Sequence, residues 1–232
     1  MATAARGRVR SLMGAAAHLG IKLGEYDAAI RTLIPHYEEL IAAAGAAVGA
    51  TARTAPAVVD LGTGSGALAH AILKARPKAR LVGIDEDAGM LTMAEKRLRG
   101  RLETVHGNFE ETAIPRCDVI SASFALHHIP TGRRKAAMYQ RCFNALRPGG
   151  VIVSADCCLA SSTALKQSHR AAWLGHLQAH HSRAKAEKYL RTWAKEDVYF
   201  TLDREVELLK EAGFGVEIAF RKTCFAVVVG LK

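Results

Sequence analysis

The chain has 232 residues, of which 50% are hydrophobic, 23% are charged and 6% are aromatic. This composition excludes a largely disordered protein, and the length is enough to bury the core of one domain. No apolar run approaches the roughly eighteen residues of a membrane span, so we expect no membrane partner. The 32 Lys and Arg against 22 Asp and Glu give a formal charge of +10, which favours anionic partners but says nothing about fold.

Strand-like and helix-like stretches alternate along most of the chain. Before the alternation begins, residues 26–48 predict two short helices divided at Pro35. Short apolar runs then predict strands at 55–61, 80–85, 102–106, 117–121 and 151–155, with helices at 68–74, 88–99 and 131–146 between them. This alternation indicates right-handed βαβ units and therefore a parallel sheet.

The last third of the chain departs from that alternation. The helix over 131–146 should stop at Arg147-Pro148-Gly149-Gly150, a sequence that breaks helices. Residues 161–193 predict one or two long helices, followed by a helix at 203–212 and strands at 216–220 and 224–230. A linker of about three residues requires these strands to pair as an antiparallel hairpin. The predicted fold is α/β, with a seven-stranded, mostly parallel sheet ended by that hairpin.

Basic residues are spread along the chain, with one local excess between Lys166 and Lys195. This stretch holds seven bases and one acid. A solvated helix face would explain the excess. Alternatively, Arg170, Arg183, Lys188 or Arg191 would face an active site and bind a carboxylate or phosphate. Few aromatic residues interleave with these bases, so nucleic acid is not the favoured partner.

The cysteines and histidines indicate neither a disulfide framework nor a metal centre. The five cysteines are odd in number and show no CxxC spacing, so a reducing cytoplasm is the expected compartment. His176, His180 and His181 lack a carboxylate or cysteine at ligand spacing, and we expect no metal there. Cys157 and Cys158 follow the fifth strand, where they would fill apolar space or line a pocket.

The strongest motif is the glycine loop Asp60-Leu61-Gly62-Thr63-Gly64-Ser65-Gly66 after the first strand. Alternating glycines let a backbone approach a ligand closely, and the following helix presents free N–H groups. The loop matches the dinucleotide fingerprint G-x-G-x-x-G poorly, because Gly66 comes one residue early. The carboxylate of Asp60 would repel a pyrophosphate, whereas it suits an ammonium group.

Three further segments leave the predicted sheet at the same edge. Asp85 ends the second strand, where an acid can accept hydrogen bonds from ribose hydroxyls. Asn108 and Phe109 follow the third strand and could contact an adenine ring, and residues 121–129 follow the fourth. Ligands of open α/β sheets bind at the carboxyl ends of strands. One adenosine ligand with an amino-acid tail would satisfy all four segments.

These motifs resemble those of the class I S-adenosylmethionine-dependent methyltransferases. The similar segments are VVDLGTGSGALA (58–69), VGIDEDAGML (82–91), GNFEE (107–111), SFALHHI (123–129) and LRPGGVIV (146–153). The resemblance implies S-adenosyl-L-methionine as cofactor, with its contacts on Asp60, Gly62, Thr63, Gly64, Gly66, Asp85, Glu86, Asn108 and Phe109. Asn108 stands where many members carry an acid that binds the adenine amino group, and an amide oxygen can still accept that bond.

The lead-in YDAAIRTLIPHYEEL (26–40) is similar to that of a branch related to the carboxy-S-adenosylmethionine synthases. This finer resemblance implies cofactor contacts for Tyr37 and Ser123, with Arg191 as the nearest counterpart of an arginine that reaches the cofactor in the synthases. The synthases carry asparagine where Ser123 stands, which argues against carboxy-transfer chemistry.

The resulting hypothesis is in-line methyl transfer to a small-molecule acceptor, with His127 or His128 as the base if one is needed. An acidic acceptor would suit Arg170, Arg183 and Arg191, and Trp173 and Trp193 would pack or bound the substrate. We expect one domain over 1–232, as a monomer or a homodimer. It would comprise a helical lead-in (1–50), the cofactor-binding core (51–156), a helical cap (157–200) and a C-terminal helix and hairpin (201–232).

Three alternatives to this hypothesis stay open. An RNA-modifying methyltransferase would bind tRNA with an affinity that falls steeply as salt rises. A carboxy-S-adenosylmethionine synthase would consume the cofactor without making a methylated product. A non-catalytic regulator would bind the cofactor and release no S-adenosylhomocysteine.

Overall fold

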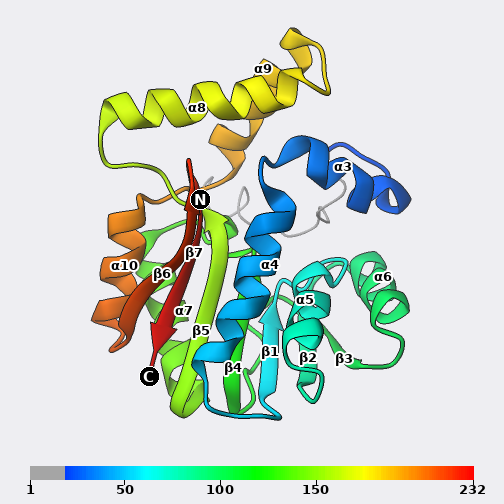
Figure 1. Cartoon of the computed structure of the whole chain (residues 1–232), viewed down its shortest axis with the longest axis vertical. Coiled ribbons are helices and arrows are strands. Elements are labelled where there is room, and N and C mark those ends of the chain that lie inside the picture. The colour runs from blue at the N-terminus through cyan, green and yellow to red at the C-terminus, as the bar shows by residue number, and fades with distance from the viewer. Residues whose placement is uncertain (1–18) are drawn as a thin grey trace, which may run out of the picture.

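The computed structural model describes residues 19–232, so the first part of the predicted lead-in, residues 1–18, lies outside the described range. A seven-stranded sheet carries helices on both faces, and a further pair of helices lies across one end (Figure 1). The strands are β1 (Ala57–Leu61), β2 (Arg80–Asp85), β3 (Leu102–His106), β4 (Cys117–Ser123), β5 (Leu146–Cys157), β6 (Gly215–Lys222) and β7 (Phe225–Leu231). The α-helices are α3 (Tyr26–Leu33), α4 (Tyr37–Ala47), α5 (Ala67–Ala75), α6 (Ala88–Leu98), α7 (Gly132–Ala145), α8 (Thr163–Gln178), α9 (Arg183–Glu196) and α10 (Leu202–Glu211).

The sheet order is β3-β2-β1-β4-β5-β7-β6. Neighbouring strands from β3 to β5 pair in parallel, whereas β7 lies antiparallel to both β5 and β6. The predicted fold class is therefore confirmed, including the C-terminal hairpin. The order turns back at β1 and β4, the point at which the carboxyl ends of an open α/β sheet leave room for a ligand.

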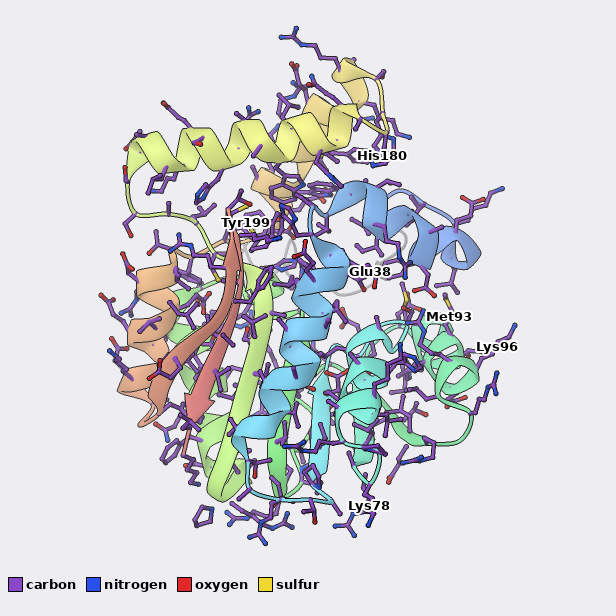
Figure 2. The ribbon with its side chains drawn as sticks, in the orientation of Figure 1. Glu38, Lys78, Met93, Lys96, His180 and Tyr199 are labelled. Atoms are coloured by element: carbon purple, nitrogen blue, oxygen red, sulfur yellow. The ribbon has the colours of Figure 1, made fainter. Side chains whose placement is uncertain are left out.

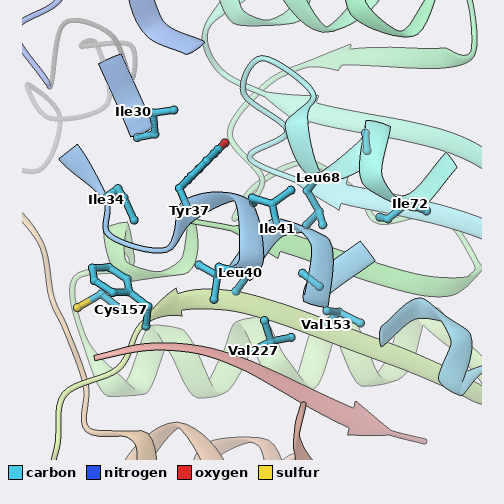
Figure 3. Close-up of a cluster of buried hydrophobic side chains, with 14 of the residues drawn as sticks. Ile30, Ile34, Tyr37, Leu40, Ile41, Leu68, Ile72, Val153, Cys157 and Val227 are labelled. Atoms are coloured by element: carbon cyan, nitrogen blue, oxygen red, sulfur yellow. The ribbon is translucent and has the colours of Figure 1, made fainter. Parts of the chain in front are cut away.

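Side chains of alternate strand residues enter two separate cores, one on each face of the sheet. On β5, Val153 packs into the cluster beneath α4 and α5, whereas its neighbour Ile152 packs into the cluster that α7 and α10 cover. Figure 3 shows the first cluster, in which Leu40 of α4 points toward Val227 of the sheet and Ile41 lies beside Leu68 of α5. The apolar runs that predicted the strands are thus explained by burial on both faces.

One predicted break has a different form in the structure. Helix α7 ends at Ala145, but the residues after it belong to β5 rather than to a loop. The register with β4 passes from Cys117↔Leu146 to Val119↔Val151, so β5 carries the extra residues as a bulge. Gly149 has a φ of 74° there, and its N–H donates to the carbonyl of Lys232 over 3.1 Å. A breaker sequence ended the helix while the chain still kept its place in the sheet.

The helical cap consists of two helices, α8 and α9, which resolves the prediction of one or two helices over residues 161–193. Figure 1 shows both at one end of the sheet, with α3 beside them. The indole N–H of Trp173 donates to the carbonyl of Leu33 over 2.8 Å, and Trp173 and Trp193 stack with centroids 5.5 Å apart. The cap is therefore fixed to the lead-in helix by a hydrogen bond and by apolar packing. Within residues 19–232, none of the helices has the length and apolarity needed to cross a membrane.

Candidate functional site

The glycine loop between β1 and α5 turns through three positive φ angles, 62° at Gly62, 52° at Gly64 and 78° at Gly66. Backbone N–H groups of Gly62 and Thr63 both donate to the carbonyl of Ile84, which fixes the loop against β2. A Cβ atom at Gly64 would meet nothing within 4 Å, whereas one at Gly62 would lie 2.6 Å from the Cβ of Ala125. The loop is thus packed on one side and open at Gly64, a cradle that fits a ligand.

Asp60, which we predicted to bind an ammonium group, lies beneath the loop with 1% of its surface exposed. Its carboxylate accepts hydrogen bonds from Thr63 Oγ1 over 2.7 Å and from Ser121 Oγ over 2.6 Å. Burial raises the pKa of Asp60 to about 6 against the opposing effect of these bonds. In this geometry Asp60 holds the loop and β4 together, and direct contact with a ligand stays a prediction.

Asp85 lies at the end of β2, directly across from the loop. Its Oδ2 accepts a hydrogen bond from Gly64 N over 2.8 Å, and its Oδ1 accepts one from Asp87 N over 2.9 Å. Burial raises the pKa of this carboxyl above its ordinary value, although both backbone bonds act in the opposite direction. The predicted ribose acceptor therefore sits at the loop with its oxygens oriented by the backbone.

The residues predicted to contact adenine come together on the next turn. Asn108 Nδ2 donates to Glu86 Oε2 over 3.3 Å, and Asn108 Oδ1 accepts from Glu110 N over 2.8 Å. The ring of Phe109 lies 3.8 Å from the position that a Cβ of Gly62 would occupy. The structure thus brings Glu86, Asn108 and Phe109 to the same edge of the sheet as the glycine loop.

The lead-in helix α3 reaches this loop through contacts that the sequence analysis missed. Ser65 Oγ donates to Asp27 Oδ1 over 2.7 Å, and Arg97 bonds to Asp27 Oδ2 and donates to the carbonyl of Ser65 over 2.7 Å. The sequence did show Asp27 as an acid one residue after the predicted start of a helix. Nothing in the sequence indicated that it would bond to Ser65, before α5, or to Arg97 of α6. The network places α3 over the loop.

Tyr37 and Ser123 were predicted to touch the cofactor. Tyr37 is buried and its ring stacks at 6.0 Å on that of Phe124, the residue after Ser123. Burial raises the pKa of the Tyr37 hydroxyl to about 12. Phe124 has a φ of 50°, which is uncommon for a bulky side chain, and this turn ends β4 beside the loop. Both predicted residues therefore lie where β4 leaves the sheet.

A pocket opens beside Phe124, between the sheet and the cap. Its empty space is about 490 Å³, including the opening to solvent. Six aromatic rings line it, from Tyr26, Phe124, Trp173, Trp193, Tyr199 and Phe225. Figure 2 shows Tyr199 below the cap, at the opposite end of the molecule from Lys78. Trp173 and Trp193 thus both pack and bound the pocket, and Cys157 contributes to its wall.

His127 forms the polar end of the pocket. Its Nδ1 lies 2.6 Å from Asp156 Oδ1, and its Nε2 lies 3.9 Å from Asp197 Oδ1. Burial opposes a charge on the imidazole, yet Asp156 and Asp197 together raise the pKa of His127 above its ordinary value. The sequence analysis did not predict Asp156. An acid near the end of an otherwise apolar strand was the pattern that could have marked it as a functional residue.

His128 and Asp197 complete this group. His128 Nδ1 lies 3.3 Å from Asp197 Oδ1, and Tyr199 donates to Asp197 Oδ2 over 2.6 Å. One side-chain nitrogen or oxygen from each of His127, His128 and Asp197 lies within 4.8 Å of the other two, so the three polar groups form one cluster. Asp197 comes from the end of α9, about 70 residues after the histidines, and no local pattern in the sequence pointed to it.

The arginines predicted to bind an acidic acceptor do not line this pocket. Arg183 and Arg191 both pair with Glu187 on α9, and their side chains are 82% and 60% exposed. Arg170 is exposed on α8. The expectation that one of these side chains faces the pocket is not met, because ion pairing and solvation along the helices hold the charges outside.

Comparison with known proteins shows what this chain is similar to. A family model described as a methyltransferase domain matches residues 58–150. The chain is 24% identical to the carboxy-S-adenosyl-L-methionine synthase of Helicobacter hepaticus, over 89% of this chain and 90% of that protein. It is 29% identical to the synthase of the same name from Chromohalobacter salexigens, over 88% of this chain and 78% of that protein.

Solved structures agree on the fold. Human N-acetylserotonin methyltransferase, solved in complex with S-adenosylmethionine, superposes with a TM-score of 0.56 and 19% identity, over 82% of this chain and 51% of that one. The chain spans about half the length of the O-methyltransferase structures that it matches. The matched domain, the relatives and the sheet order together support a class I S-adenosylmethionine-dependent methyltransferase.

Proposed function

We propose that the protein binds S-adenosylmethionine at the ends of β1, β2 and β3 and methylates a small molecule held in the aromatic pocket. The observation that carries the proposal is the position of the pocket, which shares Phe124 with the turn beside the glycine loop and ends at His127. A cofactor site and an acceptor site that adjoin in this way suit group transfer, because alignment supplies most of the rate of such a reaction.

The residues at the sheet edge fit this cofactor. The loop would approach its methionine part at Gly64, where space is open, and Asp85 would accept from the ribose hydroxyls. Asn108 and Phe109 would contact the adenine. When bound, the cofactor supplies an activated methyl group, and the sulfur keeps the electron pair of the broken C–S bond as S-adenosylhomocysteine forms.

His127 is the proposed base. Asp156 accepts from its Nδ1, so the neutral tautomer carries its lone pair on Nε2, the nitrogen on the Asp197 side of the ring. The raised pKa of His127 makes the imidazole a stronger proton acceptor. Asp156 acts as a positioning residue, since it holds the ring through both Nδ1 and the backbone N–H of His127.

Calorimetry with S-adenosylmethionine tests the cofactor site. We expect binding to the wild-type chain and a loss of affinity of about 10- to 100-fold for Asp85→Asn, since hydrogen bonds to a charged acceptor are weakened. Glu217→Gln is the matched control, because it removes an exposed acid on β6 and should change nothing. Equal affinity in all three proteins, or binding of NADH instead, would contradict the assignment.

A second candidate is synthesis of carboxy-S-adenosylmethionine, favoured by the two relatives of that name, which align over almost the whole chain. Ser123 in place of the synthase asparagine counts against it. Mass spectrometry of the products separates the two reactions. A methyltransferase yields S-adenosylhomocysteine and a methylated acceptor in equal amounts, whereas a synthase yields a carboxylated cofactor and no methylated product.

A further inference from the structure

The aromatic pocket has a composition that is selective for charge. Six aromatic rings surround it, and the carboxylate of Asp197 stands at its polar end with 2% of its side chain exposed. Asp156 adds a second buried carboxylate behind His127. Among residues 19–232, neither lysine nor arginine lines the pocket. Aromatic faces and carboxylates both carry negative potential, so they attract the same kind of ligand.

From this arrangement we infer that the methyl acceptor is an amine, bound in its ammonium form between the aromatic rings and Asp197. The inference rests on the proposed function and specifies its substrate class. Aromatic side chains recognise ammonium groups through their faces, most strongly where water is excluded. The apolar wall formed by Ile30, Ile34 and Cys157 would take the hydrocarbon part of such a molecule.

The same carboxylates already act on a titratable side chain of the protein, His127. Burial should keep the imidazole of His127 neutral, yet the nearby carboxylates raise its pKa. An ammonium group at the polar end would experience the same attraction. An acidic acceptor would experience the opposite, because Asp197 and Asp156 would repel it and the arginines of the cap lie outside the pocket.

An ammonium nitrogen has no lone pair, so it must lose one proton before it can accept a methyl group. His127 is placed to take that proton on Nε2, and His128 provides an exit. The His128 side chain is 43% exposed, and its Nδ1 lies 3.3 Å from the same Asp197 oxygen. The proton can thus pass from the pocket to solvent, and methylation of the neutral amine restores a positive charge that the aromatic rings and Asp197 stabilise.

Binding of three isosteric probes tests the inference without an assay of turnover. The probes are 2-phenylethylamine, 2-phenylethanol and phenylacetate, and the readouts are calorimetry and quenching of Trp173 and Trp193 fluorescence in the full chain, after dialysis against EDTA. We expect the amine to bind about tenfold more tightly than the alcohol, or better, with no measurable binding of the carboxylate. Alcohol or carboxylate binding as tight as that of the amine overturns the inference, and so does failure of the amine to bind at millimolar concentration.

Variants that replace a carboxylate by an amide test whether Asp197 is the residue that binds the amine. Asp197→Asn should weaken amine binding about tenfold or more and leave alcohol binding unchanged. The matched control is Glu207→Gln, which removes an exposed acid on α10 and should change neither affinity. Equal loss for amine and alcohol in Asp197→Asn would mean a merely structural role and would overturn the assignment. Circular dichroism and the Tm show whether that variant is folded. Tyr199→Phe removes only the hydroxyl bonded to Asp197 and leaves the carboxylate in place, so this variant should still bind the amine more tightly than the alcohol.

The two proposals can fail separately. If S-adenosylmethionine does not bind, the proposed function fails, whatever the probes show. If it binds, and S-adenosylhomocysteine appears with a phenol or an acid but not with 2-phenylethylamine, only the inference about the substrate class fails.

Discussion

The two halves of the ligand-binding edge are built in different ways. On the β1–β3 side, the site consists of backbone turns and of side chains that follow a strand directly, such as Asp85 and Asn108. On the β4–β5–β7 side, the pocket consists of side chains from α3, the turn after β4, β5, α8, α9 and β7, which are far apart in the sequence. The first half depends on glycines and local turns, whereas the second depends on how separate elements pack.

This difference determines which half of the site tolerates substitution. A backbone turn with positive φ angles tolerates few sequences, because only glycine adopts those angles without strain. A wall of packed side chains can change one residue at a time. Cofactor affinity should therefore fall when any atom is added to the glycine loop. Acceptor binding should depend on the charge and shape of the pocket.

The largest effect should come from His127 on the pocket side. We expect His127→Gln to lower kcat/KM by about 10²- to 10⁴-fold with an amine acceptor such as 2-phenylethylamine, because it removes the base. His128→Gln, at the adjacent position and without the Asp156 bond, should cost far less. Release of S-adenosylhomocysteine measures both variants. Equal losses would assign the proton transfer to the pair rather than to His127.

Gly62→Val should give the next largest effect, on the backbone side. Its Cβ would lie 2.6 Å from that of Ala125, at a φ of 62°. Strain and overpacking together cost on the order of 3 kcal/mol, which corresponds to about 100-fold in cofactor affinity if the loop moves to relieve them. Gly100→Val shares a positive φ, 77°, but meets nothing within 4 Å. Should both variants bind the cofactor equally well, the loop is not a close-approach site.

The titration of His127 separates the effect of neighbouring charges on its pKa from the effect of burial. It is faced by Asp156 from β5, by Asp197 after α9, by the adjacent His128, by the ring of Tyr199 and, more remotely, by Lys135 of α7. Its pKa is raised, so the imidazole is protonated at and below its ordinary value of 6.5, and kcat/KM should rise as pH rises through the higher pKa.

Asp156→Asn removes the main charge that raises the pKa of His127 and leaves the effect of burial, so this pKa should fall. NMR of the imidazole C–H signals measures the midpoint, and the rising limb of the pH profile should move to lower pH with it. An unchanged midpoint would contradict the positioning role of Asp156.

The smallest effect should come from the cap surface. Arg170→Glu and Arg183→Glu change exposed side chains outside the pocket, and exposed ion pairs contribute about 0–1 kcal/mol. We expect the KM for the acceptor to change by less than about twofold. A rise of about tenfold or more would show that an acceptor group reaches the cap face and would restore an acidic acceptor as the better hypothesis.

The fold was predictable because its signals are local. Burial on both faces makes each parallel strand a short apolar run, and the short link before Cys224 required a hairpin. The loop was predictable for the same reason, since Gly62, Gly64 and Gly66 are needed by the turn itself. By contrast, the bulge at Gly149 looked like a simple helix stop, because a breaker sequence does not say whether the chain leaves the sheet.

The polar end of the pocket was only half predictable. His127 and His128 follow a strand and could be placed at the sheet edge. The carboxylates that give them their chemistry could not, because Asp156 and Asp197 meet His127 only through the pairing of β4 with β5 and the path of the chain after α9. The surplus of bases in the cap favoured an acidic acceptor, but composition does not say which side chains of a helix face a pocket, and these bases are not among the residues that line it.

One consequence concerns how the two ligands communicate. Helix α3 holds the glycine loop through Asp27, and the same helix holds α8 through the carbonyls of Leu33 and Arg31, which bond to Trp173 and His176. A single short helix is thus a common wall of both compartments. A substitution that displaces α3 at one compartment should therefore also disturb the other, because the same helix carries the hydrogen bonds to both.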